Sequence, residues 1–435
     1  MTLKLLESQL DLFSETLPQK ARINTTSTFV DNMKLPVHRW YRFSAGFSAK
    51  WAELVINNHK TKLKSGITVL DPFAGSGTTL IAAESVGVNS YGIEAHPFII
   101  SIARAKLFYK TDLNKYIEFA KKVKSSSLII KGKVSEYPPL IHKCFTKENL
   151  ASLDRLRRAW ELHSNGTPES ELVWLTIVSL LRMTSNVGTA PWQYVLPKKI
   201  KKNLIETHAA FDLIVRNFST DMSILGPKTD FNTILLNTDA RTCKGVPDNS
   251  IDLIITSPPY ANNYDYADAT RLEMSFMKTI TGWGDLQNNV RKYLIRSCTQ
   301  HVPLKDHNLD EILNSEQLKP IAKEIREVCE QLGDIRLERG GKKTYHLMIA
   351  CYFLDIAKTW IALRRVAKTP SNICFVIGDS APYGIYVPVI EWMSTLAKAA
   401  GFKSTYFEKT RDRNIKWKNR KHRVPLCEGR LWVKG

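Results

Sequence analysis

The chain has 435 residues, a length that fits two to three domains or one domain with large insertions. Hydrophobic residues make up 43% and charged residues 24%, so the chain can bury a sizeable core and wholesale disorder is disfavoured. Lysine and arginine number 62 and aspartate and glutamate 42, which gives a formal net charge of +20. A folded chain this basic most often meets a polyanion, usually nucleic acid.

Membrane, secretory and metal-binding classes are disfavoured. No run of 18 apolar residues predicts a membrane-spanning helix, and the N-terminus has no secretory signal pattern. The seven cysteines are scattered without a Cys-x-x-Cys pair, and no two of the ten histidines stand four residues apart. We therefore expect no disulfide framework, no metal site and no membrane partner. The expected setting is the cytoplasm, a reducing compartment.

Apolar periodicity and breaking residues predict the first elements of the chain. A short helix over 3–13 lies in a polar tail, and a second helix fills the later half of 38–59. A strand over 67–70, a Gly-rich turn, a helix over 78–86 and a strand over 90–93 follow. This order is typical of the opening of a parallel α/β sheet.

The rest of the chain alternates between helical stretches and further parts of that sheet. Residues 111–229 and 281–343 are mostly helical in pattern. The other expected elements are strands over 233–236, 251–256, 373–378, 404–408 and 430–433, and helices over 268–277, 345–366 and 387–400.

A Gly-rich turn after the first predicted strand has the sequence Asp71-Pro72-Phe73-Ala74-Gly75-Ser76-Gly77-Thr78-Thr79. The two glycines permit a tight turn and a close backbone approach to a ligand, beside the unpaired N–H groups of a helix start. Glu94, 17 residues after Gly77, ends the next strand and is placed to accept hydrogen bonds from a ribose. A P-loop is disfavoured because no Gly-Lys-Ser/Thr follows, and a dinucleotide fingerprint because residue 80 is leucine. Alone, this turn would also fit a purely structural strand–helix connection.

A second motif, Ser257-Pro258-Pro259-Tyr260, directly follows the strand expected over 251–256. Two consecutive prolines keep the carbonyls of Ser257 and Pro258 out of a helix, so with the Ser257 side chain they can accept hydrogen bonds from an exocyclic amino group. Tyr260 offers a face for stacking a base. Bare Pro-Pro-Tyr is a common strand cap, but the strand, the serine and the upstream turn together favour a base-binding site. Residues 262–266 either line this pocket or only cap the next helix.

DPFAGSGTT and TSPPY together resemble the motifs of the amino-group DNA methyltransferases that use S-adenosylmethionine, and TSPPY is most similar to their cytosine-N4 branch. The resemblance extends to FVIGDS and to the terminal strands, but not to 111–229 or 281–343. It implies a Rossmann-like class I methyltransferase fold of the α/β class. The expected sheet is mostly parallel with an antiparallel terminal hairpin, and two largely helical insertions interrupt it.

The resemblance also implies which residues hold S-adenosyl-L-methionine. The segment 38–51 is similar to the one that holds the methionine end, Glu94 matches the ribose-binding acid, and Asp239 matches the acid near the adenine amino group. The expected cofactor-binding residues are Trp40, Tyr41, Phe47, Asp71, Pro72, Phe73, Ala74, Gly75, Ser76, Gly77, Thr78, Thr79, Glu94, Ala95, Asp239 and Ala240.

The reaction implied is direct transfer of the methyl group to a base that is flipped out of DNA. The expected catalytic residues are Ser257, Pro258, Pro259 and Tyr260. A cytosine-C5 enzyme with a cysteine nucleophile is disfavoured because the chain has no Pro-Cys dipeptide. Serine before Pro-Pro favours cytosine N4 in this family, and adenine N6 stays the alternative because the same acceptors can hold either amine.

We divide the chain at the edges of the two insertions. The predicted parts are a tail (1–36), a cofactor-binding core part (37–110), a helical insertion that is a candidate for target recognition (111–229), a core part with the catalytic motif (230–280), a second helical insertion (281–343), and a last core part with a basic terminal hairpin (344–435). The cofactor elements precede the catalytic motif, whereas many TSPPY enzymes have the reverse order.

DNA contacts are expected in the terminal hairpin, where residues 403–434 hold 11 basic and three acidic residues. Basic residues interleaved with an aromatic suit phosphate contacts, although a solvated loop would have the same composition. LPKKIKKN, residues 196–203, is a second candidate. The expected DNA-binding residues are Arg411, Arg413, Lys416, Trp417, Lys418, Arg420, Lys421 and Arg423.

These inferences predict a site-specific enzyme acting on double-stranded DNA, the modification half of a restriction–modification system with a cognate restriction endonuclease as a possible partner. An adenine-N6 DNA methyltransferase is the nearest alternative. An RNA or tRNA amino-methyltransferase is the next, although the sequence has no recognisable RNA-binding domain. The last is a catalytically silent nucleic-acid-binding protein, which would not need both motifs intact.

Overall fold

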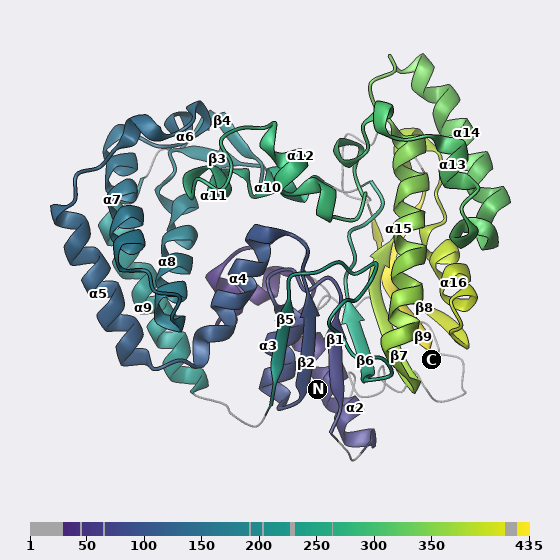
Figure 1. Cartoon of the computed structure of the whole chain (residues 1–435), viewed down its shortest axis with the longest axis horizontal. Coiled ribbons are helices and arrows are strands. Elements are labelled where there is room, and N and C mark those ends of the chain that lie inside the picture. The colour runs from purple at the N-terminus through teal and green to yellow at the C-terminus, as the bar shows by residue number, and fades with distance from the viewer. Residues whose placement is uncertain are drawn as a thin grey trace.

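The computed structural model describes residues 29–43, 46–63, 66–190, 193–201, 204–226, 231–262, 264–413 and 424–435. The helix expected over 3–13 therefore lies outside the described residues. The described chain forms a central sheet with a bundle of helices beyond one of its edges and a second group of helices beside the other (Figure 1).

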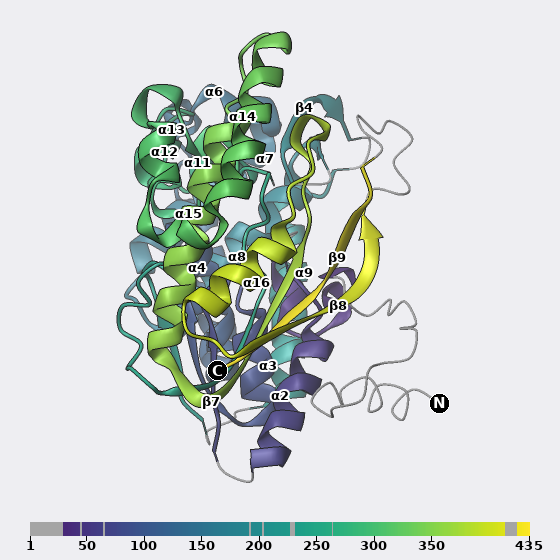
Figure 2. The ribbon, with the colours of Figure 1, turned by 90° about the vertical axis from the view of Figure 1, so that its right-hand side faces the viewer.

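Seven strands form the sheet in the order β5-β2-β1-β6-β7-β9-β8. All neighbouring pairs from β5 to β7 are parallel, and β9 is antiparallel to both β7 and β8. Figure 2 shows β8 and β9 at the outer edge of the sheet. This arrangement confirms the expected methyltransferase fold with its antiparallel terminal hairpin. The strands are β1 (Thr68–Asp71), β2 (Asn89–Ile93), β5 (Thr233–Leu236), β6 (Ile251–Thr256), β7 (Ala367–Gly378), β8 (Ser404–Arg413) and β9 (Leu426–Lys434).

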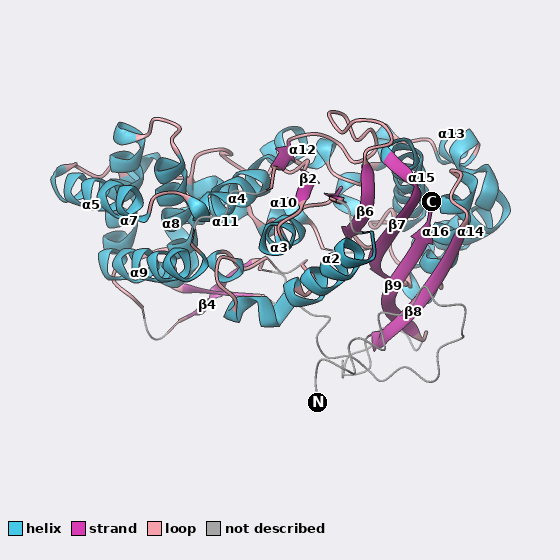
Figure 3. Cartoon of the chain, turned by 90° about the horizontal axis from the view of Figure 1, so that it is seen from below, coloured by secondary structure: helices cyan, strands magenta, loops and turns pink. Residues whose placement is uncertain are grey.

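Helices cover both faces of the sheet, as the view from below makes clear (Figure 3). Successive strand residues point to opposite faces. On β6, Leu253 and Ile255 therefore pack with α2 (Ala49–Leu63) and α3 (Thr78–Val86), whereas Ile254 packs on the opposite side with α15 (Tyr345–Val366) and α16 (Val389–Ala399). The sheet is buried on both faces, which explains why its central strands have continuous apolar sequences.

Helix α15 is long and apolar enough to cross a membrane by length and composition alone. Here, however, 89% of its most apolar window is buried inside the protein. Trp360 of this helix stacks on Phe375 of β7, with ring centroids 4.4 Å apart. The apolar sequence of α15 is therefore accounted for by its position against the sheet.

The stretch 111–229 folds mainly into helices that surround a core of their own. A two-stranded antiparallel hairpin also occurs there and was not expected from the sequence. Pro197 and the lysines that follow hide its strand pattern, and a two-stranded hairpin tolerates them because both strands are edges. The elements are α4 (Pro97–Leu107), which precedes the stretch, α5 (Leu113–Ile129), α6 (Pro139–Cys144), α7 (Lys147–His163), α8 (Pro168–Thr184), β3 (Val187–Thr189), β4 (Val195–Ile200) and α9 (Thr207–Leu225).

Residues 295–343 pack beside α15, on the side of the sheet away from that bundle (Figure 1), whereas residues 285–290 pack with the bundle core through Leu286 and Val290. Two short helices replace the single one expected over 268–277, because the chain breaks at Thr270. Before the stretch 281–343 lie α10 (Tyr266–Ala269) and α11 (Arg271–Phe276), and within it lie α12 (Asp285–Asn289), α13 (Leu309–Leu313) and α14 (Ala322–Glu338).

Candidate active site

The Gly-rich turn joins β1 to α3 at the carboxyl end of the parallel strands. Gly75 and Gly77 have φ values of 53° and 86°, a region that side chains with a Cβ rarely adopt. A Cβ on Gly75 would also lie 2.8 Å from Cε1 of Phe43. Glycine at position 75 therefore lets the turn fold tightly against the Phe43 ring.

Asp71 connects three elements beneath this turn. Its carboxylate is buried and accepts hydrogen bonds from the hydroxyls of Thr79 and Thr256, each at 2.6 Å, and from the Phe73 amide at 3.0 Å. Burial raises the pKa of Asp71 to about 6, against the effect of these hydrogen bonds. Asp71 thus fixes the turn relative to the end of β6, where the second motif begins.

Glu94 lies at the end of β2 and faces the turn. Its two carboxylate oxygens accept hydrogen bonds from the amides of Gly75 and His96, both at 2.8 Å. Burial raises the pKa of Glu94 to about 7, although the two amides favour the charged form. Each carboxylate oxygen has a second lone pair, so Glu94 can still accept hydrogen bonds from a bound ligand.

The second motif leaves the end of β6 beside this turn. The Ser257 hydroxyl donates to the backbone carbonyl of Val376 at 3.1 Å, and the Tyr352 hydroxyl donates to the carbonyl of Pro259 at 2.9 Å. Tyr260 is half-buried, and burial raises its pKa. Hydrogen bonds from the protein therefore orient two groups of this motif.

A cleft joins the two motifs. Ser257 and Pro259 line it, whereas Pro258 and Tyr260 do not. Of the expected cofactor-binding residues, those that line the cleft are Phe47, Asp71, Pro72, Phe73, Ala74, Gly75, Ser76, Thr78, Glu94, Ala95, Asp239 and Ala240. Gly77 and Thr79 are buried behind the turn.

Trp40 and Tyr41 lie away from the cleft. Trp40 belongs to a short 3-10 helix (His38–Trp40), stacks on Phe218 of α9 at 4.1 Å and donates its indole N–H to Asp221 at 2.8 Å. The side chain of Tyr41 is also buried. The aromatic residues of 38–51 that line the cleft are Phe43 and Phe47, because Trp40 and Tyr41 are buried away from it.

Several cleft residues were missed by the sequence reasoning. Phe43 stands in the segment 38–51. Tyr266 belongs to 262–266, which we expected either to line the base pocket or to cap a helix, and its ring centroid lies 4.5 Å from that of Tyr264. Tyr293, Leu294 and Ile295 come from the stretch 281–343, where no motif pointed to them. The additional lining residues are Phe43, Gly46, Ile93, His96, Ile99, Tyr266, Tyr293, Leu294 and Ile295.

Asp265 anchors the chain that follows the second motif. Its carboxylate caps α10 and accepts hydrogen bonds from Arg291 at 2.5 Å and 3.0 Å, and His301 lies 3.3 Å from it. Burial alone would raise the pKa of Asp265, but these partners lower it to about 2. Cys298 lies beside Asp265 and His301, and the ligating atoms of these three residues could meet at a metal ion. Arg291 already balances the charge of Asp265, so this cluster functions as an anchor between the motif and the second insertion.

The residues present fit S-adenosylmethionine. Apolar side chains of Phe43, Phe73 and Ile93 and the carboxylate of Glu94 line one cleft. The Ser76 hydroxyl is buried in the same cleft and has no hydrogen-bond partner among the described residues. Rings and acceptors in this combination suit an adenosine with ribose hydroxyls, and the unpaired hydroxyl gains a partner when a ligand binds.

The expected DNA-binding residues fall only partly in the described chain. Arg411 and Arg413 lie in β8, which extends beyond the strand expected over 404–408. Arg411 pairs with Glu428 at 2.7 Å. Arg413 donates to the Asp379 carbonyl at 2.6 Å, and its guanidinium lies 5.1 Å from the Tyr260 ring centroid. Lys416, Trp417, Lys418, Arg420, Lys421 and Arg423 lie outside the described residues.

Comparisons with known proteins agree with this geometry. Residues 14–105 match the model of a family of N6/N4 methyltransferases described as DNA methylases. The chain is similar to the type II methyltransferase M.BsoBI of Geobacillus stearothermophilus, with 24% identity over 86% of this chain and 80% of that protein. It is also similar to the type II methyltransferase M.AvaI of a Nostoc species, with 25% identity over 86% and 81% of the two chains.

A shorter match of 37% identity joins 18% of this chain to 14% of the type II methyltransferase M.MjaII of Methanocaldococcus jannaschii. The order of the seven strands, the cleft between the two motifs and these matches support one another. Together they indicate that the chain is an S-adenosylmethionine-dependent DNA methyltransferase, and its residues 14–105 are similar to the N6/N4 DNA methylases.

Proposed function

We propose that this enzyme methylates the exocyclic N4 amine of cytosine at a specific sequence in double-stranded DNA. The observation that carries the choice of base is Ser257, which stands before Pro258 and Pro259 at the end of β6. In the amino-methyltransferases that the motifs resemble, serine at this position favours cytosine N4. Adenine N6 is the second candidate, because the matching family covers both N4 and N6 enzymes.

The Ser257 hydroxyl is oriented for this role. Because its proton is directed to the Val376 carbonyl, its oxygen presents lone pairs to a donor such as a base amino group. Hydrogen bonds from that amino group to Ser257 and to the Pro258 carbonyl would turn the nitrogen lone pair out of conjugation with the ring. The Pro259 carbonyl is already used by Tyr352, so it serves to fix the loop.

S-adenosylmethionine supplies a methyl group that is already activated on a sulfonium. The residues of the chain therefore need only to bind, orient and exclude water. In our proposal Tyr260 stacks on the flipped base while Ser257 and Pro258 align its amine with the cleft. The Arg413 guanidinium over the ring holds Tyr260 in place from the side of β8.

We also propose that the enzyme is the modification half of a type II restriction–modification system, with a cognate restriction endonuclease as its partner and the cytoplasm as its place of action. The similar proteins named above are type II methyltransferases, which supports this role. The net charge of +20 supports double-stranded DNA as the substrate, because each phosphate contact releases counterions. The basic residues of 411–423 are the proposed phosphate contacts.

The test is a nucleoside digest with mass spectrometry after incubation with labelled S-adenosylmethionine and unmethylated DNA. We expect label in N4-methylcytosine, and about 10²-fold slower labelling with the Ser257→Ala variant. Label in N6-methyladenine would overturn the choice of base but keep the fold, the cofactor and the catalytic loop. Label in RNA and none in DNA would overturn the substrate itself.

A further inference from the structure

The stretch 281–343 contributes one wall of the cofactor cleft. Three consecutive residues, Tyr293, Leu294 and Ile295, line the cleft together with Asp239 and Ala240. Neither the motifs nor the matching family model, which ends at residue 105, reaches this stretch. This stretch therefore places side chains beside Asp239, the acid expected near the adenine, so it contributes to the cofactor cleft itself.

Asp355 of α15 attaches this wall to the core. Its carboxylate is 1% exposed and accepts hydrogen bonds from Arg296 through Nε at 2.9 Å, Nη2 at 2.6 Å and the backbone amide at 3.1 Å. Arg296 immediately follows the three wall residues. Because the contact uses both the guanidinium fork and the main chain, it fixes the direction of the chain as well as its position.

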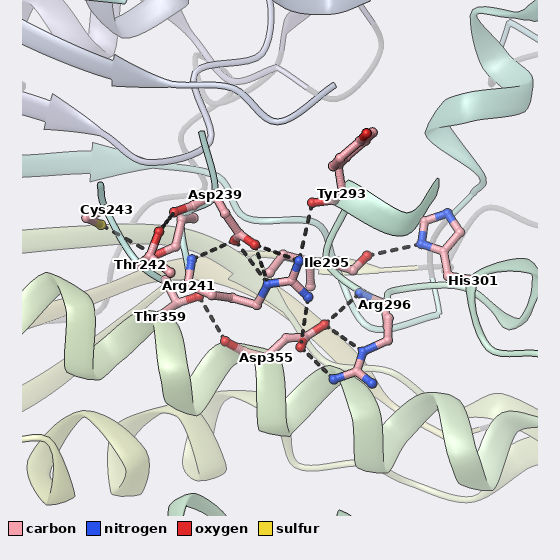
Figure 4. A network of polar contacts seen from close by, with 11 residues as sticks. Asp239, Arg241, Thr242, Cys243, Tyr293, Ile295, Arg296, His301, Asp355 and Thr359 are labelled. Atoms are coloured by element: carbon pink, nitrogen blue, oxygen red, sulfur yellow. Dashed lines mark hydrogen bonds and ion pairs between the residues drawn. The ribbon is translucent and has the colours of Figure 1, made fainter. Parts of the chain in front are cut away.

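Arg241 links the Asp355 carboxylate to Asp239, the acid expected near the adenine. Nη1 of Arg241 donates to Asp355 at 3.1 Å, and its Nε lies 2.8 Å and 3.0 Å from the two carboxylate oxygens of Asp239. Its Nη2 donates to the Tyr293 carbonyl at 3.4 Å. Figure 4 shows this continuous network from Asp239 through Arg241 and Asp355 to Arg296.

The charges of the network balance, with two arginines shared between two acids. His301 supports the wall from the far side, where its Nδ1 lies 3.1 Å from the Ile295 carbonyl oxygen. Without Asp355, Arg296 would lose every partner it has among the described residues, and Arg241 would keep only Asp239 and the Tyr293 carbonyl. One buried carboxylate therefore contacts both the arginine that follows the wall and the arginine that holds Asp239.

We propose that Tyr293, Leu294 and Ile295 bind the adenine end of S-adenosylmethionine, and that Asp355 positions this wall and Asp239 through Arg296 and Arg241. The wall residues would contact the adenine, and Asp239 would accept a hydrogen bond from its amino group. The inference extends the proposed function at its cofactor site. It is independent of which base receives the methyl group.

The test is equilibrium binding by calorimetry, with the full chain and no DNA. The ligands are S-adenosylhomocysteine and S-inosylhomocysteine, which lacks the adenine amino group. We expect Asp355→Asn to weaken S-adenosylhomocysteine about tenfold, as the loss of a hydrogen bond to a charged group does. We expect the ratio of the two dissociation constants to fall toward one, because Arg241, which orients Asp239, loses its contact with Asp355. Loss of stability alone would not change that ratio.

Two further variants keep the proposal testable if Asp355→Asn fails to fold. Tyr293 is 45% exposed and belongs to the wall itself, so Tyr293→Ala should weaken both ligands several-fold. Arg296→Lys keeps the charge but loses the fork, and should weaken both ligands to a smaller extent.

Asp154→Asn is the matched control. Asp154 is a buried acid of the helical bundle that accepts hydrogen bonds from Arg157 at 2.9 Å, Tyr137 at 2.8 Å and the Lys133 amide at 2.7 Å. This variant should lose stability and keep both affinities. Wild-type affinities in Asp355→Asn and Tyr293→Ala, or an equal loss in Asp154→Asn, would overturn the proposal. DNA that carries N6-methyladenine would overturn the proposed base and leave this inference untouched.

Discussion

The two sides of the cleft differ in charge. The side formed by the Gly-rich turn and β2 carries Asp71 and Glu94, and Asp239 follows β5 nearby. The side formed by the end of β6 carries Ser257 and Pro259, both neutral, and the neutral Pro258 and Tyr260 of the same motif follow outside the cleft lining. Each of the three carboxylates accepts a hydrogen bond from a protein group, whereas the Ser257 hydroxyl donates one to the Val376 carbonyl.

This difference separates binding from transfer. Carboxylates suit a ligand that offers hydroxyl and amino donors, so we propose that the acidic side recognises the cofactor. The neutral side positions an amine without taking its proton, which suffices because the methyl group is already activated. A substitution on one side should therefore change cofactor affinity, and one on the other side should change the rate of transfer.

The largest expected effect is on the neutral side. Ser257→Ala should lower the rate of methyl transfer by about 10²-fold, since it removes one positioned polar group from the reacting centre. Tyr260→Ala should weaken the productive complex by roughly 10- to 100-fold through lost stacking. Single-turnover transfer to DNA measures both variants.

Affinity for S-adenosylhomocysteine is the control for these two variants, and it should stay within a few-fold of the wild type. If cofactor affinity fell in parallel with transfer, the separation of the two sides would be wrong. The base pocket would then have to lie elsewhere in the cleft.

On the acidic side, Glu94→Gln should weaken cofactor binding by roughly 10- to 100-fold, the cost of losing hydrogen bonds to a charged acceptor. The rate of transfer at saturating cofactor should change little. Calorimetry and single-turnover kinetics together test this split. If Glu94→Gln had normal cofactor affinity but slow transfer, Glu94 would act in methyl transfer rather than in cofactor binding.

The pH dependence of cofactor binding also tests the role of Glu94. Burial raises the pKa of Glu94 to about 7, and only the ionised form accepts hydrogen bonds on both oxygens. Affinity for the cofactor should therefore rise with pH through about 7 and fall by up to tenfold per pH unit below it. Asp71 and His96, the buried titratable neighbours, have pKa values of about 6 and about 4 and titrate lower. Glu94→Gln should give a flat profile near pH 7 with the same ligand.

Much of the acidic side could be predicted from sequence, because its residues follow one another along the chain. The turn from Asp71 to Thr79 and the acid at the end of the next strand follow from strand–turn–helix order alone. The helices Thr78–Val86 and Tyr345–Val366 and the strands Thr233–Leu236 and Ile251–Thr256 have the bounds expected from their apolar patterns.

What could not be predicted depends on packing between distant segments. The sequence of 38–51 has several aromatic residues, but only the fold decides that Phe43 faces the cleft while Trp40 packs on α9. The sequence does not distinguish Arg413 from the other basic residues of the terminal hairpin, because its contact with the Tyr260 ring depends on the position of β8. Tyr293, Leu294 and Ile295 have no motif, and their place depends on a carboxylate more than 50 residues away in the chain.

The smallest expected effect comes from behind the neutral side. Tyr352 lies on α15, is not among the residues that line the cleft, and donates its hydroxyl to the Pro259 carbonyl at 2.9 Å. Tyr352→Phe keeps the ring in the core and removes one hydrogen bond, worth about 1 kcal/mol. If this bond holds the catalytic loop, transfer should slow by about fivefold while affinity for S-adenosylhomocysteine stays constant. An equal loss of affinity would mean that α15 supports the whole cleft rather than the neutral side alone, and the two sides would not be separable.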